Sequence, residues 1–283
     1  RHGLLAYASS FDQIGVLTNT VQDAAILIEI MAGQDEFDST SSSTVVAPYS
    51  KELHYTEKAK IAYFDTAIHH DSLDKDIKEK TLSFIEALQS EGHTVEPVKF
   101  ELLDYMVPAY YVLTTAEASS NLARYDGIRY GYRSPNAHNL ESTYLLSRTE
   151  GFSEEVQRRI MLGTFVLSSG YYDAYYTKAQ KVRRLLAEQT AAILKAYDFI
   201  LMPTTPSPAF KIGETMADPV AMYLADIYTV HANLVGIPAI SLPLGTHSNG
   251  LPIGIQFLSN KFEEGKLFAF SQYIFEHHLS KLL

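Results

Sequence analysis

Apolar residues first recur with helical spacing over residues 20–33. Their spacing of three and four positions is typical of a helix with one buried face: Val21, Ala24, Ala25, Ile28, Met31 and Ala32. Thr20 is a suitable N-cap and Asp23 completes a capping box, while Gly33 stands where a C′ glycine is expected. The pattern therefore predicts a helix over 20–33, followed by a Ser- and Thr-rich loop at 38–44.

Residues 59–98 alternate between two periodicities. A short β-rich run at 60–64 is followed by helical spacing over 73–90, and a second β-rich run occupies 93–98. Gly92 separates the helix from the returning strand. A strand–helix–strand unit implies parallel pairing, with the helix packed on the sheet.

Strand patterns disappear from about residue 101 to 196, where helical patterns follow one another and tyrosine is concentrated. This stretch predicts a helical layer at 101–196, inserted into an α/β core, with its last helix over 172–197. The elements expected after it are a strand at 199–202, a helix at 218–235, strands at 239–244 and 253–258, and a helix at 263–278. Asn249-Gly250 favours a turn between the last two strands.

These elements predict the α/β fold class, with a mixed β-sheet flanked by helices and a largely helical insertion. Neither an internal repeat nor a flexible linker is visible, so residues 1–283 are interpreted as one domain. The chain starts at Arg1 without an initiator Met. We therefore expect an N-terminally truncated domain, cut from a longer protein.

The amino-acid composition argues against several classes of function. Hydrophobic residues make up 46% and charged residues 20%, which is typical of a globular protein. The absence of cysteine excludes disulfides, zinc–cysteine sites and a cysteine nucleophile from these residues. A net charge of −10 argues against a chain-wide nucleic-acid surface. The absence of cysteine also fits a cytoplasmic protein, which is the location we expect. No apolar run is long enough to cross a bilayer, so no membrane partner is expected.

No self-sufficient catalytic motif is present. Serine pairs begin at Ser9, Ser119 and Ser168, but no adjacent base identifies a nucleophile, so structural roles are favoured. The histidine pairs His69-His70 and His277-His278 point in divergent directions, and a shared metal is not expected.

Two charged residues are candidates for binding. Arg159 belongs to a Glu-Glu-x-x-Arg-Arg run whose spacing is typical of a solvated helix face, although arginine also commonly clamps carboxylates. Asp226 interrupts an otherwise apolar stretch and must be either exposed or paired. Spacing alone leaves both the structural and the functional interpretation open.

Several motifs together resemble the amidase-signature superfamily. They are Ala8-Ser-Ser-Phe-Asp-Gln-Ile-Gly15, Thr20-Val-Gln-Asp-Ala-Ala25, Asn233-Leu-Val-Gly-Ile-Pro-Ala-Ile240 and Gly250-Leu-Pro-Ile-Gly-Ile-Gln256. Three central motifs resemble the A subunits of glutamyl-tRNA(Gln) amidotransferases. They start at Glu117, at Ser147 and at Arg158, and read Glu-Ala-Ser-Ser-Asn-Leu-Ala-Arg-Tyr-Asp-Gly, Ser-Arg-Thr-Glu-Gly-Phe and Arg-Arg-Ile-Met-Leu-Gly-Thr-Phe.

The resemblance implies an activity and partners. Such A subunits hydrolyse glutamine, and the ammonia passes to a B subunit that uses ATP and Mg²⁺ to amidate Glu-tRNA(Gln). A small C subunit stabilises the pair. The family's catalytic serine, second serine and lysine would lie upstream of Arg1, so we expect no catalytic residue, no metal and no cofactor in this chain, and no activity from these residues alone.

The resemblance also implies a substrate site. The family's glutamine-binding residues match Tyr110, Arg159 and Asp226. Arg159 would clamp the α-carboxylate, Asp226 would receive the α-ammonium, and Tyr110 would close one side. His2 and Val16 depart from the family's usual aromatic residue and proline, with no expected change in activity. Two alternatives remain: a stand-alone amidase for another small amide, and a non-catalytic assembly surface for the B and C subunits.

Overall fold

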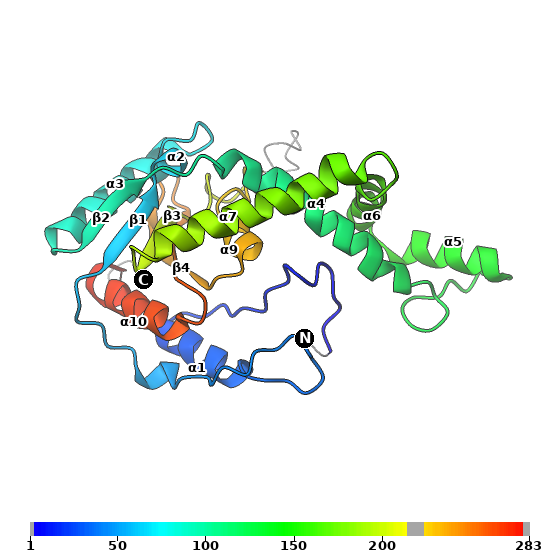
Figure 1. Ribbon diagram of the computed structural model, residues 1–283, viewed down its shortest axis with the longest axis horizontal. Helices are drawn as coiled ribbons and strands as arrows, with labels where there is room; N and C mark the ends of the chain where they lie inside the picture. The colour runs from blue at the N-terminus through cyan, green and yellow to red at the C-terminus, as the bar shows by residue number, and fades with distance from the viewer. Residues whose placement is uncertain (1–2, 214–223, 280–283) are drawn as a thin grey trace. The chain divides into compact units, whose positions relative to one another are not determined.

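The computed structural model describes residues 3–213 and 224–279 (Figure 1). Backbone contacts divide the chain into two compact units. The helical unit comprises Arg1–Asp12 and Pro108–Arg183, and the sheet unit comprises Gln13–Val107 and Arg184–Leu283. We describe each unit by itself. The single-domain interpretation of residues 1–283 stays a prediction, and His2 lies outside the described residues.

One five-stranded sheet forms the centre of the sheet unit, in the order β2-β1-β3-β5-β4. Its strands are β1 (Lys60–Phe64), β2 (Thr94–Val98), β3 (Phe199–Pro203), β4 (Ala239–Thr246) and β5 (Pro252–Leu258). β1 pairs in parallel with β2 and β3, whereas β5 is antiparallel to both β3 and β4. The mixed sheet, the parallel βαβ unit and the fold class are therefore confirmed. Every residue of the central strand β3 is buried, as expected for a strand covered on both faces.

Helix termini in the sheet unit follow the capping signals in the sequence. Helix α1 (Val21–Met31) begins after Thr20, whose Oγ1 accepts a hydrogen bond from the Asp23 N–H at 3.0 Å. It ends two residues before Gly33, which has a φ of +131°. Helix α3 (Lys75–Ser90) is capped by the Asp74 carboxylate. Helix α10 (Glu264–Ile274) lies beside α1 and continues as a π-helical turn, Phe275–Leu279 (Figure 1).

Residues 101–196 contain helices and no strand, all within the described range. The elements are α4 (Leu103–Asn121), α5 (Leu140–Gly151), α6 (Glu154–Val166), a π-helical segment (Tyr172–Thr177) and α7 (Lys178–Leu194), with a short 3₁₀ turn (Leu122–Arg124) after α4. The predicted helical character of this stretch is confirmed. Shorter elements of the sheet unit are α2 (Asp65–Ile68) and a 3₁₀ turn (Tyr49–Lys51).

The helix predicted over 218–235 is only partly present. Residues 214–223 lie outside the described part, and α9 (Val230–Val235) is the helix observed after them. Residues 225–229 form turns, so the prediction is wrong there. Tertiary packing outweighs local helix propensity at this point, because Tyr228 is fully buried and its hydroxyl donates to the Ala67 carbonyl at 3.0 Å.

His231, on α9, is fully buried in the core of the sheet unit. Its ring lies 5.3 Å from the rings of both Phe64 and Phe100, and its Nε2 is 2.7 Å from Thr190 Oγ1. Its Nδ1 has no hydrogen-bond partner in the described structure. Burial lowers the pKa of His231 to about 3, so the folded protein holds this imidazole neutral.

We expect this histidine to make stability fall as the pH drops below about 6.5. In that range the unfolded histidine takes up a proton, whereas folded His231 stays neutral until its pKa of about 3 is reached. The unfolded state therefore binds more protons, and the free energy of unfolding should decrease by up to about 1.4 kcal/mol per pH unit. Urea unfolding of wild type and His231→Gln across this range measures the slope. Equal slopes in the two proteins would contradict the assignment.

Candidate functional site

Arg159 lies on α6 in the helical unit and is contacted from three sides. Its Nε donates to Glu155 Oε1 at 2.8 Å, and its Nη1 donates to the Tyr7 hydroxyl at 3.3 Å. The guanidinium carbon is 5.6 Å from the centre of the Tyr111 ring. Its side chain is 29% exposed, against 57% for the neighbouring Arg158. Arg159 is therefore held in one place but still reaches solvent.

The environment keeps the Arg159 guanidinium charged. Burial by itself lowers its pKa, but hydrogen bonds to Tyr7 and Glu155 outweigh burial and raise the pKa above the ordinary arginine value. The hydrogen bond from Arg159 in turn lowers the pKa of Glu155. Within the described residues Nη2 has no hydrogen-bond partner, so the Nη1–Nη2 end can face a carboxylate.

A close contact between α4 and α6 places Arg159 over Tyr111. A Cβ added at Gly163 would lie 1.9 Å from the Thr115 carbonyl oxygen and 2.8 Å from Ser119 Cβ. Gly163 and Arg159 are four residues apart on α6, and Tyr111 and Thr115 are four apart on α4, so each pair shares a helix face. Gly163 could not be singled out from the sequence, where its only signal is a glycine inside a predicted helix.

Tyr110 lies on α4 and packs edge-on against two rings. The centre of its ring is 5.8 Å from that of Phe11 and 5.5 Å from that of Tyr111, with interplanar angles near 90°. Tyr111 also contacts the Arg159 guanidinium. The structure thus brings Tyr110 and Arg159 to one aromatic cluster, which consists of Tyr7, Phe11, Tyr110 and Tyr111.

Two members of this cluster come from the N-terminal segment Tyr7–Asp12. The Asp12 carboxylate accepts hydrogen bonds at 3.1 Å from the N–H groups of Tyr7 and Ala8, which closes the segment into a turn. Asn121 Nδ2 donates to the Tyr7 carbonyl and to Ser9 Oγ, both at 3.1 Å. Ser9 therefore has a structural partner, as the sequence analysis favours.

Asp226 belongs to the sheet unit and precedes α9. It is partly buried, and its carbonyl accepts hydrogen bonds at 3.1 Å from the N–H groups of Thr229 and Val230. It thereby starts the turn that leads into the helix. Its pairing with Arg159 across a bound amino acid stays a prediction, as does the assignment of all three residues as a site.

The histidine pairs have separate partners. His69 Nδ1 lies 3.2 Å from Asp65 Oδ1, and His70 Nε2 lies 3.3 Å from Asp104 Oδ1. His278 Nε2 lies 3.1 Å from Glu91 Oε2. Among the residues that the structure describes, no group of three or more His, Asp or Glu side chains could hold a metal ion. No helix in that part of the chain is long and apolar enough to cross a bilayer.

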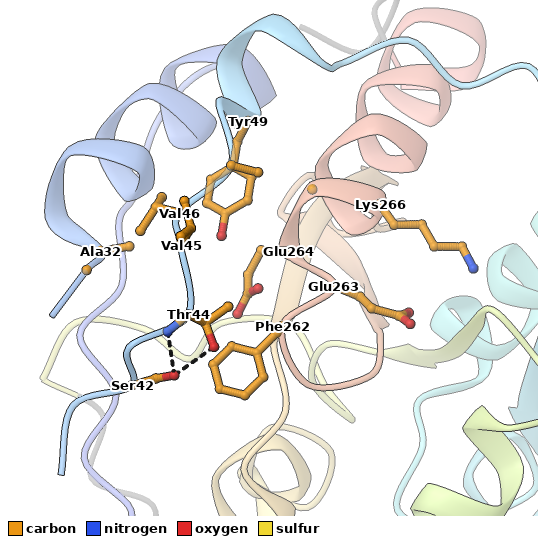
Figure 2. Close-up of a pocket in the computed structure, with 13 residues that line it drawn as sticks. Ala32, Ser42, Thr44, Val45, Val46, Tyr49, Phe262, Glu263, Glu264 and Lys266 are labelled. Carbon is orange, nitrogen blue, oxygen red and sulfur yellow. Dashed lines mark hydrogen bonds between the residues drawn. The ribbon is translucent and has the colours of Figure 1, made fainter.

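Figure 2 shows a separate pocket of about 400 Å³ in the sheet unit, between the segment after α1 and the start of α10. The Tyr49 hydroxyl and the Glu264 carboxylate point into it, together with the Phe262 ring. Lys266 points away and pairs with Asp198 at 2.6 Å. The pocket contains none of the three predicted binding residues, and its lining includes no serine with an adjacent base.

Comparison with known proteins identifies the family of this chain. A family model described as Amidase matches residues 1–268. The A subunit of the glutamyl-tRNA(Gln) amidotransferase of Chlorobium phaeobacteroides is 51% identical over 269 residues, which are 94% of this chain and 56% of that protein. Its counterpart in Brevibacillus brevis is 50% identical and is matched over 93% of this chain and 54% of its own length.

Solved structures of known proteins share the fold of this chain. The A subunit of the Thermotoga maritima glutamyl-tRNA(Gln) amidotransferase superposes with a TM-score of 0.76 at 40% identity, over 97% of this chain and 55% of that one. A peptide amidase from Stenotrophomonas maltophilia has a TM-score of 0.70 at 21% identity, over 98% and 56%, and shares the fold. The chain spans a little over half the length of these relatives. With 268 of its residues inside one family model, the chain belongs to the amidase family.

Proposed function

We propose that these residues form the C-terminal, substrate-recognising portion of the glutaminase subunit of a tRNA-dependent amidotransferase. About 50% identity to the A subunits of glutamyl-tRNA(Gln) amidotransferases supports the parent activity. The full-length protein would hydrolyse glutamine in the cytoplasm. It would supply ammonia to a B subunit that uses ATP and Mg²⁺ to convert Glu-tRNA(Gln) to Gln-tRNA(Gln), with a C subunit in the complex. The nucleophilic serine, the second serine and the lysine base would lie outside these 283 residues.

The observation that carries the proposal is the environment of Arg159. A guanidinium that is fixed by Glu155 and Tyr7 and belongs to a partly exposed side chain is suited to a carboxylate ligand. Glutamine carries an α-carboxylate for Arg159 and an α-ammonium for Asp226, and Tyr110 packs against Tyr111, the ring that contacts Arg159. These contacts would hold the side-chain amide against the nucleophile, and such positioning lowers the activation barrier substantially.

Two glutamine analogues test this proposal in the full-length protein with its B and C partners. Glutaramate lacks the α-ammonium, and γ-aminobutyramide lacks the α-carboxylate. We expect kcat/KM for each to fall roughly ten- to a hundredfold below glutamine, because each leaves one charged protein group without its partner. Asp226→Asn should abolish only the discrimination against glutaramate, and Arg159→Met only the discrimination against γ-aminobutyramide.

The outcomes separate the two enzymatic alternatives. Equal hydrolysis of glutamine and both analogues by the wild-type protein would favour a stand-alone amidase. If Asp226→Asn retained the full preference for glutamine over glutaramate, Asp226 would not be the ammonium site. Recovery of the B subunit with the full-length protein from its source cells would support the amidotransferase.

A further inference from the structure

Arg183, in the first turns of α7, contacts the segment Tyr7–Asp12 in three ways. Its Nη1 donates to Ser10 Oγ and its Nη2 donates to the Ser10 carbonyl, both at 2.8 Å. Its guanidinium carbon lies 4.0 Å from the centre of the Phe11 ring, a close cation–π contact. Arg183 is partly buried, unlike Arg184, whose side chain is 81% exposed.

Glu117, on α4, contacts the same serine and carries the opposite charge to Arg183. Its carboxylate accepts a hydrogen bond from the Ser10 N–H at 2.9 Å and another from the Ser10 hydroxyl. Burial lowers the pKa of Arg183, and the negative charge of Glu117 opposes this effect. Ser10 therefore links a cation on α7 to an anion on α4.

The residues on both sides of Ser10 contact the predicted binding residues. Phe11, under Arg183, packs edge-on against Tyr110. Tyr7, three residues before Ser10, accepts a hydrogen bond from Arg159 Nη1 through its hydroxyl. The segment Tyr7–Asp12 thus contacts both Tyr110 and the Arg159 guanidinium.

We infer that Arg183 and Glu117 are positioning residues for the α-carboxylate of the substrate. They clasp Ser10, and through Tyr7 and Phe11 they orient Arg159 and Tyr110. Neither would touch the reacting atoms. The inference rests on the proposed function, since it deepens the description of the same amino-acid site.

The test measures glutamine kinetics in the full-length protein with its partners. Arg183→Met should raise KM about three- to thirtyfold with kcat nearly unchanged. The reason is that loss of a residue that orients the Arg159 guanidinium weakens substrate binding. Arg183→Lys keeps the charge but not the planar fork, and should give an intermediate KM. Arg184→Met is the matched control, because Arg184 lies next in sequence and pairs with Glu188 on the surface, and it should leave KM unchanged.

A double-mutant cycle separates positioning from general stability. Arg183→Met and Arg159→Lys together should raise KM by less than the product of their single effects. Once the planar Arg159 guanidinium is lost, the contacts of Arg183 and Glu117 with Ser10 have less to orient. A full product of the two effects, or an Arg183→Met that behaves like Arg184→Met, would overturn the inference. If Arg183→Met does not fold, Glu117→Gln is the substitute. It removes the negative charge on the other side of Ser10 but keeps an acceptor for the Ser10 hydrogen bonds.

Two further outcomes distinguish a wrong positioning role from a wrong amino-acid site. If Arg159→Lys raises KM and Arg183→Met does not, only the positioning role is wrong. If Arg159→Lys itself leaves KM for glutamine unchanged, the proposed amino-acid site is wrong.

Discussion

Arg159→Met in the full-length protein is expected to raise the KM for glutamine roughly a hundredfold. The substitution keeps much of the side-chain volume but removes the only guanidinium in contact with Tyr7 and Tyr111 among the described residues. Loss of a bidentate, charge-assisted hydrogen bond to a carboxylate costs about 2–3 kcal/mol, and 1.4 kcal/mol corresponds to a tenfold change. Steady-state kinetics with glutamine measure the effect.

Arg158→Met provides the matched control. Arg158 lies next to Arg159 on α6 and pairs with Glu154 and Glu155, but more than half of its side chain is exposed. Exposed pairs of this kind contribute little to stability, so the KM should stay within about twofold of wild type. An equal rise in KM for both variants would show that charge on this helix, rather than the Arg159 fork, governs glutamine binding.

Gly163→Ala is expected to lower the free energy of unfolding by about 2–3 kcal/mol, although alanine is the better helix former. The added methyl group would lie 1.9 Å from the Thr115 carbonyl oxygen, a backbone atom that cannot move without separating α4 from α6. The same separation would lift Arg159 off the Tyr111 ring and raise the KM for glutamine. Urea unfolding and glutamine kinetics of the full-length protein check the two effects.

Gly15→Ala serves as the control for Gly163→Ala. No atom lies within 4 Å of a Cβ added at Gly15, and its φ is not positive. The substitution adds the same methyl group without a collision, so stability should be unchanged within about 0.5 kcal/mol. If Gly163→Ala were as stable as Gly15→Ala, α4 and α6 would not be in the close contact described above.

The sheet and most helices could be predicted because their apolar positions repeat with a fixed period. The strand Lys60–Phe64 and the helix at 75–90 have uninterrupted patterns, and their boundaries agree with the structure within two residues at most. The turn at 225–229 could not be predicted, because the burial of Tyr228 against Ala67 depends on a residue 161 positions away. Such tertiary contacts leave no periodic signal in the local sequence.

The candidate site, too, could be predicted only in part from the sequence. Spacing alone could not separate Arg159 from Arg158, because both have acidic residues one helical turn earlier. The resemblance to a family favoured Arg159, and the structure shows the physical difference: Arg159 contacts Tyr7, which is 152 positions away. The clasp of Ser10 by Glu117 and Arg183 joins segments 107 and 173 positions apart, so no local pattern could indicate it.

A crystal structure of the full-length protein with glutamine bound would show which protein groups hold the amino acid. We expect the α-carboxylate to lie against the Nη1–Nη2 end of Arg159, the α-ammonium to lie within hydrogen-bond distance of the Asp226 carboxylate, and Tyr110 to flank the ligand. Glutamine bound with its carboxylate on another cation, and with Asp226 turned away from the ligand, would contradict it.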